Sequence, residues 1–146
     1  MIRRAIKLTL LATAMLLAPG LVPHGQPADL LAVARRDLGL SEVRNRAYIR
    51  RMVGLDPVRQ PWCAAWAGAK VRQAGLTPPA GYHASASWRR WRGAASCRRG
   101  AVAVFRRHIA FVSRVEGRWV WVIGGNQRNG VTEKRVARAT IMSCRR

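Results

Sequence analysis

Cys63 is the residue of this sequence that is best placed to act as a nucleophile. It follows Pro61 and Trp62 at the start of an apolar stretch that is typical of a helix. Proline is favoured at the first position of a helix, so we expect the sulfur in the first turn. There, free backbone N–H groups and the positive helix end lower the pKa of a thiol and can stabilise an oxyanion. The alternative is a buried cysteine that serves only as a small apolar residue.

A thiolate needs a neighbouring base, and His108 is the histidine that we expect to supply it. The other two are His24, in a predicted linker, and His83, in a predicted loop, whereas His108 begins a predicted strand. Strand alternation places Ala110 on the same face as His108, and a small neighbour would let the Cys63 helix lie over that face. The alternative is a surface histidine flanked by two arginines.

The segment Gly124-Gly125-Asn126-Gln127 follows the next predicted strand and could supply a third catalytic residue. A side-chain amide oxygen there could accept a hydrogen bond from the second ring nitrogen of His108 and fix its tautomer. Glycines permit a tight turn that aims one amide inward. The alternative is a turn without any catalytic role.

The elements that must position these side chains change type along the chain. Helical spacing of apolar residues comes first, with Arg35, Arg36 and Asp37 on the polar side of the first helix. Runs rich in β-branched residues follow Gly100, with a hairpin turn expected at Glu116-Gly117. The expected helices span about 28–38, 41–53, 61–75 and 84–92, and the expected strands 101–105, 108–112, 118–123, 131–136 and 139–143. Helices followed by strands predict an α+β domain, with an antiparallel sheet of about five strands packed on the Cys63 helix.

The N-terminal residues indicate export. Arg3, Arg4 and Lys7 precede an apolar run over residues 8–18, which is typical of a secretory signal and short for a membrane span. We therefore expect residues 1–20 to be a signal peptide or an uncleaved membrane anchor. Residues 21–27 are expected to be a linker, and residues 28–146 the folded domain.

The composition is that of a folded but strongly basic protein. Hydrophobic residues make up 49%, and the formal net charge is +21. Removing residues 1–20 takes away three positive charges and leaves +18. Such a charge attracts polyanions, and export favours peptidoglycan and anionic wall polymers over nucleic acid. The alternative is a solubilising charge that reflects the coding habit of the source.

Other partners and cofactors are not expected. The sequence has neither a zinc-finger motif nor an aromatic stacking ribbon, so we expect no specific nucleic-acid partner. It has no Cys-x-x-Cys, no His-x-x-x-His and no paired carboxylates, so no metal and no cofactor are expected. We expect a monomer that contacts a membrane only if the N-terminal segment is not cleaved.

The cysteine count is odd, which matters in an exported protein because thiols that can pair usually do. Cys97 and Cys144 flank the predicted sheet and could form a disulfide, leaving Cys63 as a free thiol. The alternative is three unpaired, partly buried cysteines.

Five motifs in register make the chain similar to a family of small CHAP/NlpC-P60-like proteins of bacteria and phages. The similarity covers about residues 29–146. The motifs are Leu38-Gly39-x-x-Glu42, Pro61-Trp62-Cys63-Ala64-Ala65-Trp66, Ala84-x-x-x-Trp88, His108-Ile109-Ala110-Phe111-Val112 and Gly124-Gly125-Asn126-Gln127-x-Asn129-x-Val131.

This resemblance implies a papain-like fold and a cysteine peptidase or amidase that cleaves an amide bond of peptidoglycan through a thioester. It implies Cys63 as nucleophile, His108 as base and Asn126 as third member. The bond cut stays open: it could join muramic acid to L-Ala or lie within the stem peptide or a cross-bridge. A catalytically inactive, basic wall- or polyanion-binding protein with the same fold is the alternative function.

The chain departs from the family pattern at two places. Gly100-Ala101 stands where relatives often have Gly-Asp, so a structural carboxylate is missing. Arg107 stands where they often have glycine before the histidine, which we expect to make the pocket entrance basic. Trp62 is expected to pack in the core.

Overall fold

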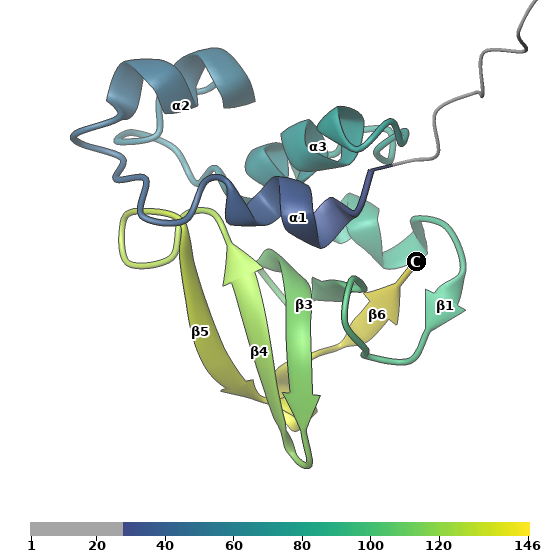
Figure 1. The fold of residues 1–146 in the computed structure, drawn as a ribbon. Coiled ribbons are helices and arrows are strands. Elements are labelled where there is room, and N and C mark those ends of the chain that lie inside the picture. The colour runs from purple at the N-terminus through teal and green to yellow at the C-terminus, as the bar shows by residue number, and fades with distance from the viewer. Residues whose placement is uncertain (1–27) are drawn as a thin grey trace, which may run out of the picture.

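A layer of helices lies across one end of a curved antiparallel sheet (Figure 1). The computed structural model of this chain describes residues 28–146, so the expected signal or anchor and the linker lie outside the described residues. The strand order of the sheet is β1-β6-β2-β3-β4-β5. The expected α+β class with helices on an antiparallel sheet is confirmed, and the sheet has six strands where about five were expected.

The first helix, α1 (Leu30–Arg35), forms because its apolar residues share one buried face. Asp29 caps its start by accepting a hydrogen bond from the backbone N–H of Leu31 at 3.0 Å. The expected polar side is only partly exposed. Asp37 follows the helix and is 3% exposed, because its carboxylate pairs with Nζ of Lys70 at 2.5 Å and accepts from the Trp66 indole at 2.8 Å.

The second helix, α2 (Arg46–Val53), begins five residues later than expected. Residues 41–45 form a turn in which Asn45 Oδ1 accepts from the backbone N–H of Ser41 at 2.9 Å, and an asparagine that bonds the backbone in this way favours a turn over a helix. The helix ends at Gly54, as expected, with a left-handed φ of 73°.

The third helix, α3 (Cys63–Gln73), is the central helix that the sequence predicts, and its residues from Cys63 to Val71 are all buried. Among residues 28–146, no helix is long and apolar enough to cross a membrane. The fourth expected helix is a 3-10 helix, η1 (Ser85–Arg90), which places Trp88 in the core.

The strands are β1 (Ala94–Ala95), β2 (Val102–Val104), β3 (Ile109–Glu116), β4 (Trp119–Gly124), β5 (Thr132–Ala137) and β6 (Ser143–Arg145). The two-residue strand β1 was not expected, because two alanines carry no alternating pattern. Glu116 pairs with Trp119, so the hairpin turn consists of Gly117 and Arg118, one residue later than expected. The last expected strand begins as a 3-10 turn, η2 (Arg138–Thr140), before β6.

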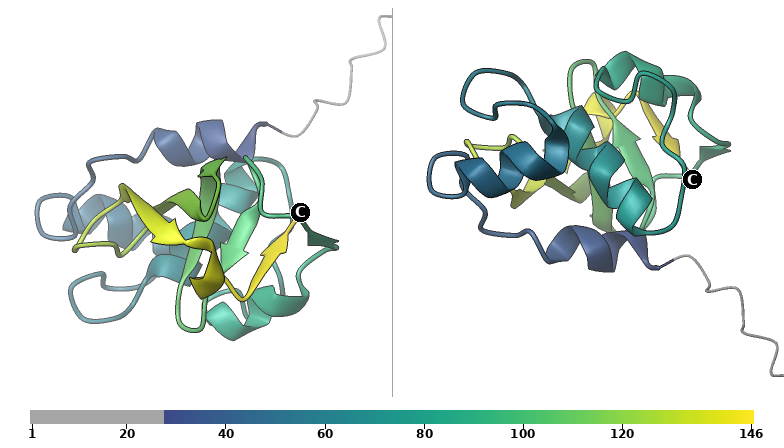
Figure 2. Two further views of the ribbon diagram at one scale, coloured as in Figure 1. Left: turned by 90° about the horizontal axis from the view of Figure 1, so that it is seen from below. Right: turned by 90° about the horizontal axis from the view of Figure 1, so that it is seen from above.

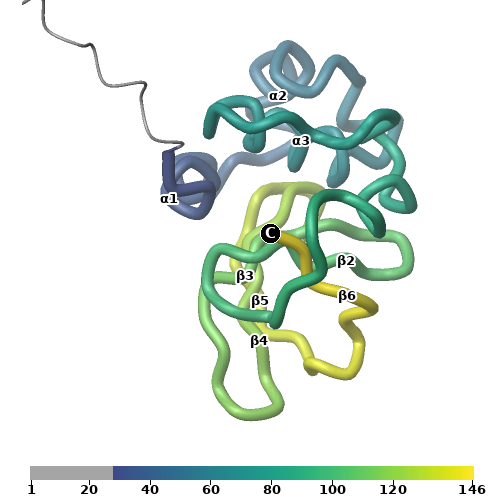
Figure 3. The backbone as a smooth tube through the Cα atoms, turned by 90° about the vertical axis from the view of Figure 1, so that its right-hand side faces the viewer, coloured from purple at the N-terminus to yellow at the C-terminus, as the bar shows by residue number. Residues whose placement is uncertain are grey.

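Two apolar clusters form on opposite faces of the sheet. One lies under the helices, where Trp66 of α3 packs on Phe111 of β3 with ring centroids 5.3 Å apart. The other lies on the opposite face and contains Ala103, Ala110 and Val122. Figures 2 and 3 show how the sheet curves away below the helices, so that β6 and β1 lie on the same side of the molecule as the start of α1.

A disulfide joins Cys97 to Cys144, which confirms the pairing that the cysteine count suggested. Their Cα atoms lie 5.2 Å apart, because Ala95 pairs with Cys144 between the neighbouring strands β1 and β6. Cys63 is left as the free thiol.

Candidate active site

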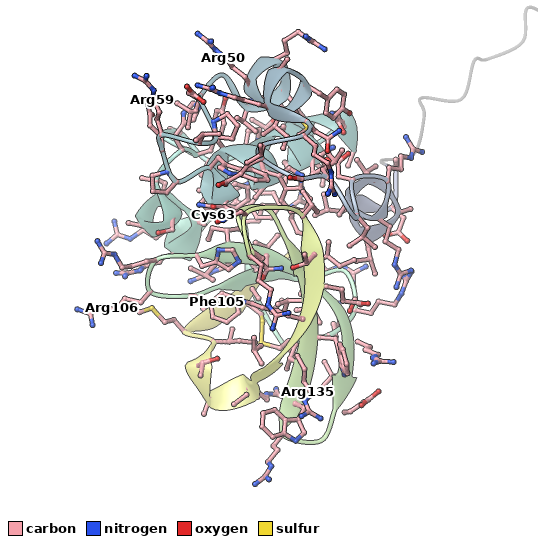
Figure 4. All side chains as sticks on the ribbon, turned by 90° about the vertical axis from the view of Figure 1, so that its left-hand side faces the viewer. Arg50, Arg59, Cys63, Phe105, Arg106 and Arg135 are labelled. Carbon is pink, nitrogen blue, oxygen red and sulfur yellow. A yellow bond between two sulfur atoms is a disulfide. The ribbon has the colours of Figure 1, made fainter. Side chains whose placement is uncertain are left out.

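The sulfur of Cys63 lies at the start of α3, where the helix meets the sheet (Figure 4). The helix begins at Cys63 itself, with Trp62 as the N-cap residue, so Pro61 stands just outside the helix rather than at its first position. Trp62 is fully buried, as expected, and its indole donates to Glu42 at 3.2 Å. This bond ties the segment before α2 to the residue that precedes Cys63.

Backbone groups on both sides of His108 surround the sulfur. The thiol of Cys63 donates to the carbonyl oxygen of Arg107 at 3.9 Å. The backbone N–H of Ile109 lies close enough to stabilise a thiolate, as do the N–H groups of Cys63 and Ala64. The structure therefore brings Cys63 to the strand end that carries His108, as the sequence predicts.

The imidazole of His108 is held by the side chain of Gln127. The two side chains meet at 3.1 Å between Nε2 of the ring and Oε1 of the amide. The amide NH2 of Gln127 donates to the carbonyl oxygen of Thr132 at 2.6 Å, and that oxygen can only accept. Oε1 therefore faces the ring and accepts from Nε2–H, which leaves Nδ1 of His108 unprotonated and able to take a proton.

Asn126, which the resemblance implies as third member, does not occupy this position. Its backbone is left-handed, with a φ of 55°, and this turn directs the next residue, Gln127, inward. Gln127 is 3% exposed, whereas Asn126 is half-buried and lines a neighbouring cleft. The expectation for Asn126 is thus wrong in geometry, and the adjacent amide makes the contact.

A tight turn fixes Gln127 in place. Its backbone N–H donates to Gly130 at 2.9 Å and its carbonyl accepts from Gly130 at 3.1 Å. The two residues between them, Arg128 and Asn129, have positive φ values of 50° and 60°. Positive φ at both central positions is the conformation of a type I′ turn, which asparagine tolerates better than most residues.

The helix does not lie over the face of β3 that we expected. His108 and Ala110 share a face, but α3 packs on the opposite face, against Phe111. The larger side chains there bury more apolar surface under the helix. The small residues beside His108 instead make room for its ring: a Cβ on Gly124 would lie 2.9 Å from Nε2 of His108.

Burial determines the protonation states of Cys63 and His108 in the structure without substrate. It raises the pKa of the Cys63 thiol, against the effect of the N–H groups of Ile109, Ala64 and Cys63 itself. It also lowers the pKa of His108 to about 4, against the hydrogen bond to Gln127. The expectation that the helix end would lower the thiol pKa is therefore wrong, because loss of hydration outweighs the N–H groups. The resting pair is a neutral thiol beside a neutral imidazole.

A cleft of about 220 Å³ is lined by chain neighbours of Cys63 and Gln127, and neither Cys63 nor His108 lines it. Its lining includes Asn126 and Asn129 and the segment from Pro57 to Pro61, which leads into α3. It also includes Glu42, the acceptor for Trp62. The two asparagine amides could bind peptide groups of an extended ligand.

The other two histidines do not take part in this arrangement. His83 is exposed and stacks on Tyr82, with ring centroids 4.2 Å apart. His24 lies outside the described residues. Within residues 28–146, no three His, Cys, Asp or Glu side chains are grouped as metal ligands.

Comparisons with known proteins return nothing for this chain: no family model matches it, and neither does any curated protein or solved structure.

Two features that support the site had no signal in the sequence. Nothing in the pattern distinguished Gln127 from Asn126, because both amides follow the same pair of glycines. The buried pair of Asp37 and Lys70 was also missed, since charged residues are almost never fully buried unless paired and the two are 33 positions apart.

Proposed function

We propose that this chain is a secreted cell-wall hydrolase that cleaves an amide bond of peptidoglycan through a thioester on Cys63. One observation carries the proposal: Cys63 lies at a helix start against the backbone that flanks His108, and Nε2 of that histidine is held by Gln127. An inert cysteine would not need a base whose tautomer is fixed by a buried amide.

The geometry suggests the following reaction. Nδ1 of His108 takes the thiol proton while the sulfur of Cys63 attacks the carbonyl carbon of the amide. Backbone N–H groups of Cys63 and Ala64, at the start of α3, stabilise the negative oxygen that forms. The imidazolium then gives its proton to the leaving amine, and a thioester remains. Water, deprotonated by His108, attacks the thioester and releases the carboxylate product and the thiol.

In this proposal Gln127 is a positioning residue that acts through His108. It keeps the proton on Nε2 and stabilises the positive charge that the ring gains during the reaction. The papain-like fold belongs to the same proposal, and a helix carrying the cysteine packed on an antiparallel sheet carrying the histidine supports it.

Peptidoglycan is proposed as substrate on the basic charge and the N-terminal pattern. The arginines would concentrate the enzyme on an anionic wall, and an exported protein meets that polymer. The cleft beside Asn126 and Asn129 offers amides for the peptide part of the substrate.

Zymography on purified sacculi tests the proposal. We expect clearing by the wild type and none by Cys63→Ala or His108→Ala. His83→Ala is the matched control, because it removes an exposed histidine without touching the site, and it should clear as the wild type does. Mass spectrometry of the released fragments then identifies the bond.

A basic wall-binding protein without catalysis is the alternative, favoured by the raised thiol pKa and by the net charge. In that case no clearing would occur with any variant, and all of them would sediment with sacculi at low salt.

A further inference from the structure

A second cavity, of about 370 Å³, lies away from Cys63. It is enclosed by the start of α1, by β6 and by the segment on either side of β1, which Figure 1 shows on one side of the molecule. Leu76 lines it just beyond the end of α3, whereas Cys63 begins that helix. Eleven helical residues span roughly 16 Å, so the two places are separate.

The wall of this cavity combines apolar side chains with arginines. The apolar residues include Leu30, Leu76 and Trp91. The arginines are four: Arg92, Arg99, Arg145 and Arg146.

The acidic side chains of the cavity do not balance these charges. Asp29 is the only carboxylate side chain in the wall, and it both caps α1 and pairs with Arg99 at 3.4 Å. Within residues 28–146, no Asp or Glu side chain forms an ion pair with Arg92 or Arg145. Asp29 and the terminal carboxylate of Arg146 offset two of the four positive charges. The two charges that remain repel each other, and a bound anion would relieve that repulsion.

Arg145 has an unused hydrogen-bond donor here. Its Nε is buried and has no hydrogen-bond partner among the described residues. A buried donor without an acceptor is unfavourable, and such groups are rare in folded proteins. The atom is not exposed to the cavity in this structure, so an anion would meet it only after a shift of the Arg145 side chain.

The backbone at Arg92, which lines this cavity, is strained. Its φ is 50°, in the left-handed region that a residue with a long side chain rarely adopts. Its guanidinium lies 5.7 Å from the centroid of the Trp91 ring, at the cavity wall. Strained residues of this kind cluster at ligand sites, where the surrounding structure holds them.

The frame around the arginines is rigid. The disulfide between Cys97 and Cys144 joins the segment before Arg99 to the residue before Arg145. The backbone N–H of Arg146 donates to Gly93 at 3.2 Å, which fixes the loop that carries Arg92. These links constrain the backbone that carries the arginines, and a guanidinium group binds phosphate or carboxylate with two parallel hydrogen bonds.

We propose that this cavity binds an oxyanion group, phosphate or carboxylate, of a small organic ligand whose apolar part contacts Trp91 and Leu76. The site is separate from Cys63, and the proposal does not depend on hydrolase activity.

Thermal unfolding of the purified protein tests this site. Sodium phosphate, glycerol phosphate and sodium acetate are titrated at constant ionic strength, with chloride as the balancing anion. We expect Tm to rise with the logarithm of the concentration of at least one oxyanion, because a ligand that binds only the folded state stabilises it by mass action. Comparison of the phosphate and acetate arms shows which oxyanion the site prefers.

Two variants locate the binding. Arg92→Gly removes a guanidinium and suits the left-handed backbone, so it should fold at least as well as the wild type and bind the oxyanion at least tenfold more weakly. Arg145→Gln should also weaken binding tenfold or more. Arg50→Gln, on α2, removes an equal charge elsewhere and should bind as the wild type does.

The outcomes separate this proposal from the hydrolase proposal. Cys63→Ala should keep the full rise in Tm even though it abolishes catalysis. Equal rises in wild type, Arg92→Gly and Arg50→Gln would show unspecific charge neutralisation and overturn the site. No rise with any of the three anions would overturn it as well. If Arg145→Gln does not fold, the Arg92→Gly result alone decides.

Discussion

Oε1 of Gln127 lies 3.1 Å from Nε2 of His108, and the amide NH2 of the same residue donates to the Thr132 carbonyl at 2.6 Å. Because the Thr132 oxygen can only accept, the amide has one orientation, and the imidazole has one tautomer. The buried turn after β4 thereby determines which ring nitrogen of His108 is free to accept a proton.

Replacing Gln127 should therefore reduce turnover. Gln127→Leu keeps the approximate size of the side chain but removes the hydrogen bond, and we expect kcat to fall roughly a hundredfold. The acid limb of the pH profile should move below its wild-type position, because the hydrogen bond that His108 donates to Gln127 raises the pKa of His108. Asn126→Gly is the comparison variant, because it removes the neighbouring amide and tolerates the left-handed backbone. It should leave kcat within about twofold and the acid limb unmoved, and the loss of its substrate contact should appear in KM. If kcat fell more for Asn126→Gly than for Gln127→Leu, Asn126 and not Gln127 would be the residue that orients His108.

In the wild type, the acid limb of the pH profile of kcat/KM should lie at an unusually low pH. Burial lowers the pKa of His108 to about 4, and the base must be neutral to accept the thiol proton. Activity should therefore persist as pH falls through 6 and decline only near pH 4. The measurement is kcat/KM of the free enzyme between pH 3 and 8, with an NMR titration of the His108 ring as a direct check. A limb near 6.5 would show that the ring is hydrated in solution.

Cys63 should alkylate as a thiol and not as a preformed thiolate. Burial raises its pKa, so the rate with iodoacetamide should increase only at alkaline pH. The same protein unfolded in urea with its disulfide intact is the control, and its midpoint should lie lower, at about 8.5. Rapid alkylation of the folded protein below pH 7 would instead reveal a thiolate at rest.

Two neighbouring glycines should separate catalysis from stability. A Cβ on Gly124 would lie 2.9 Å from Nε2 of His108, so Gly124→Ala should displace the ring and lower kcat strongly. A Cβ on Gly125 would lie 2.7 Å and 2.8 Å from the rings of Trp62 and Trp66, so Gly125→Ala should cost about 1–3 kcal/mol of the free energy of unfolding. Each variant is the control for the other, in urea unfolding and turnover assays. If Gly124→Ala and Gly125→Ala lowered kcat equally under conditions in which both variants are folded, the placement of the His108 ring against Gly124 would be wrong.

The disulfide should leave one free thiol per chain. Thiol counting on the denatured, unreduced protein should give one, from Cys63. Cys97→Ala with Cys144→Ala should lower the free energy of unfolding by about 4 kcal/mol, the chain-entropy value for a loop of 47 residues. A count of three would mean that the purified protein is reduced.

Much of the arrangement follows from local patterns in the sequence. Pro61 before an apolar run indicated a helix start at Cys63, and the change to β-rich runs after Gly100 indicated the sheet. Helical and strand periodicities are local properties, so they survive in the fold wherever the apolar face is clear. The disulfide followed from counting three cysteines, with the alternative of free thiols left open.

Tertiary structure decided what the local pattern could not. Which face of β3 the helix covers depends on the relative sizes of Phe111 and Ala110 in the assembled core. Whether Asn126 or Gln127 reaches His108 depends on one left-handed residue, and single positive φ values have weak sequence signals outside glycine. The pKa values of Cys63 and His108 depend on how completely the sheet and the helices exclude water, which is a property of the whole packed domain and not of any segment.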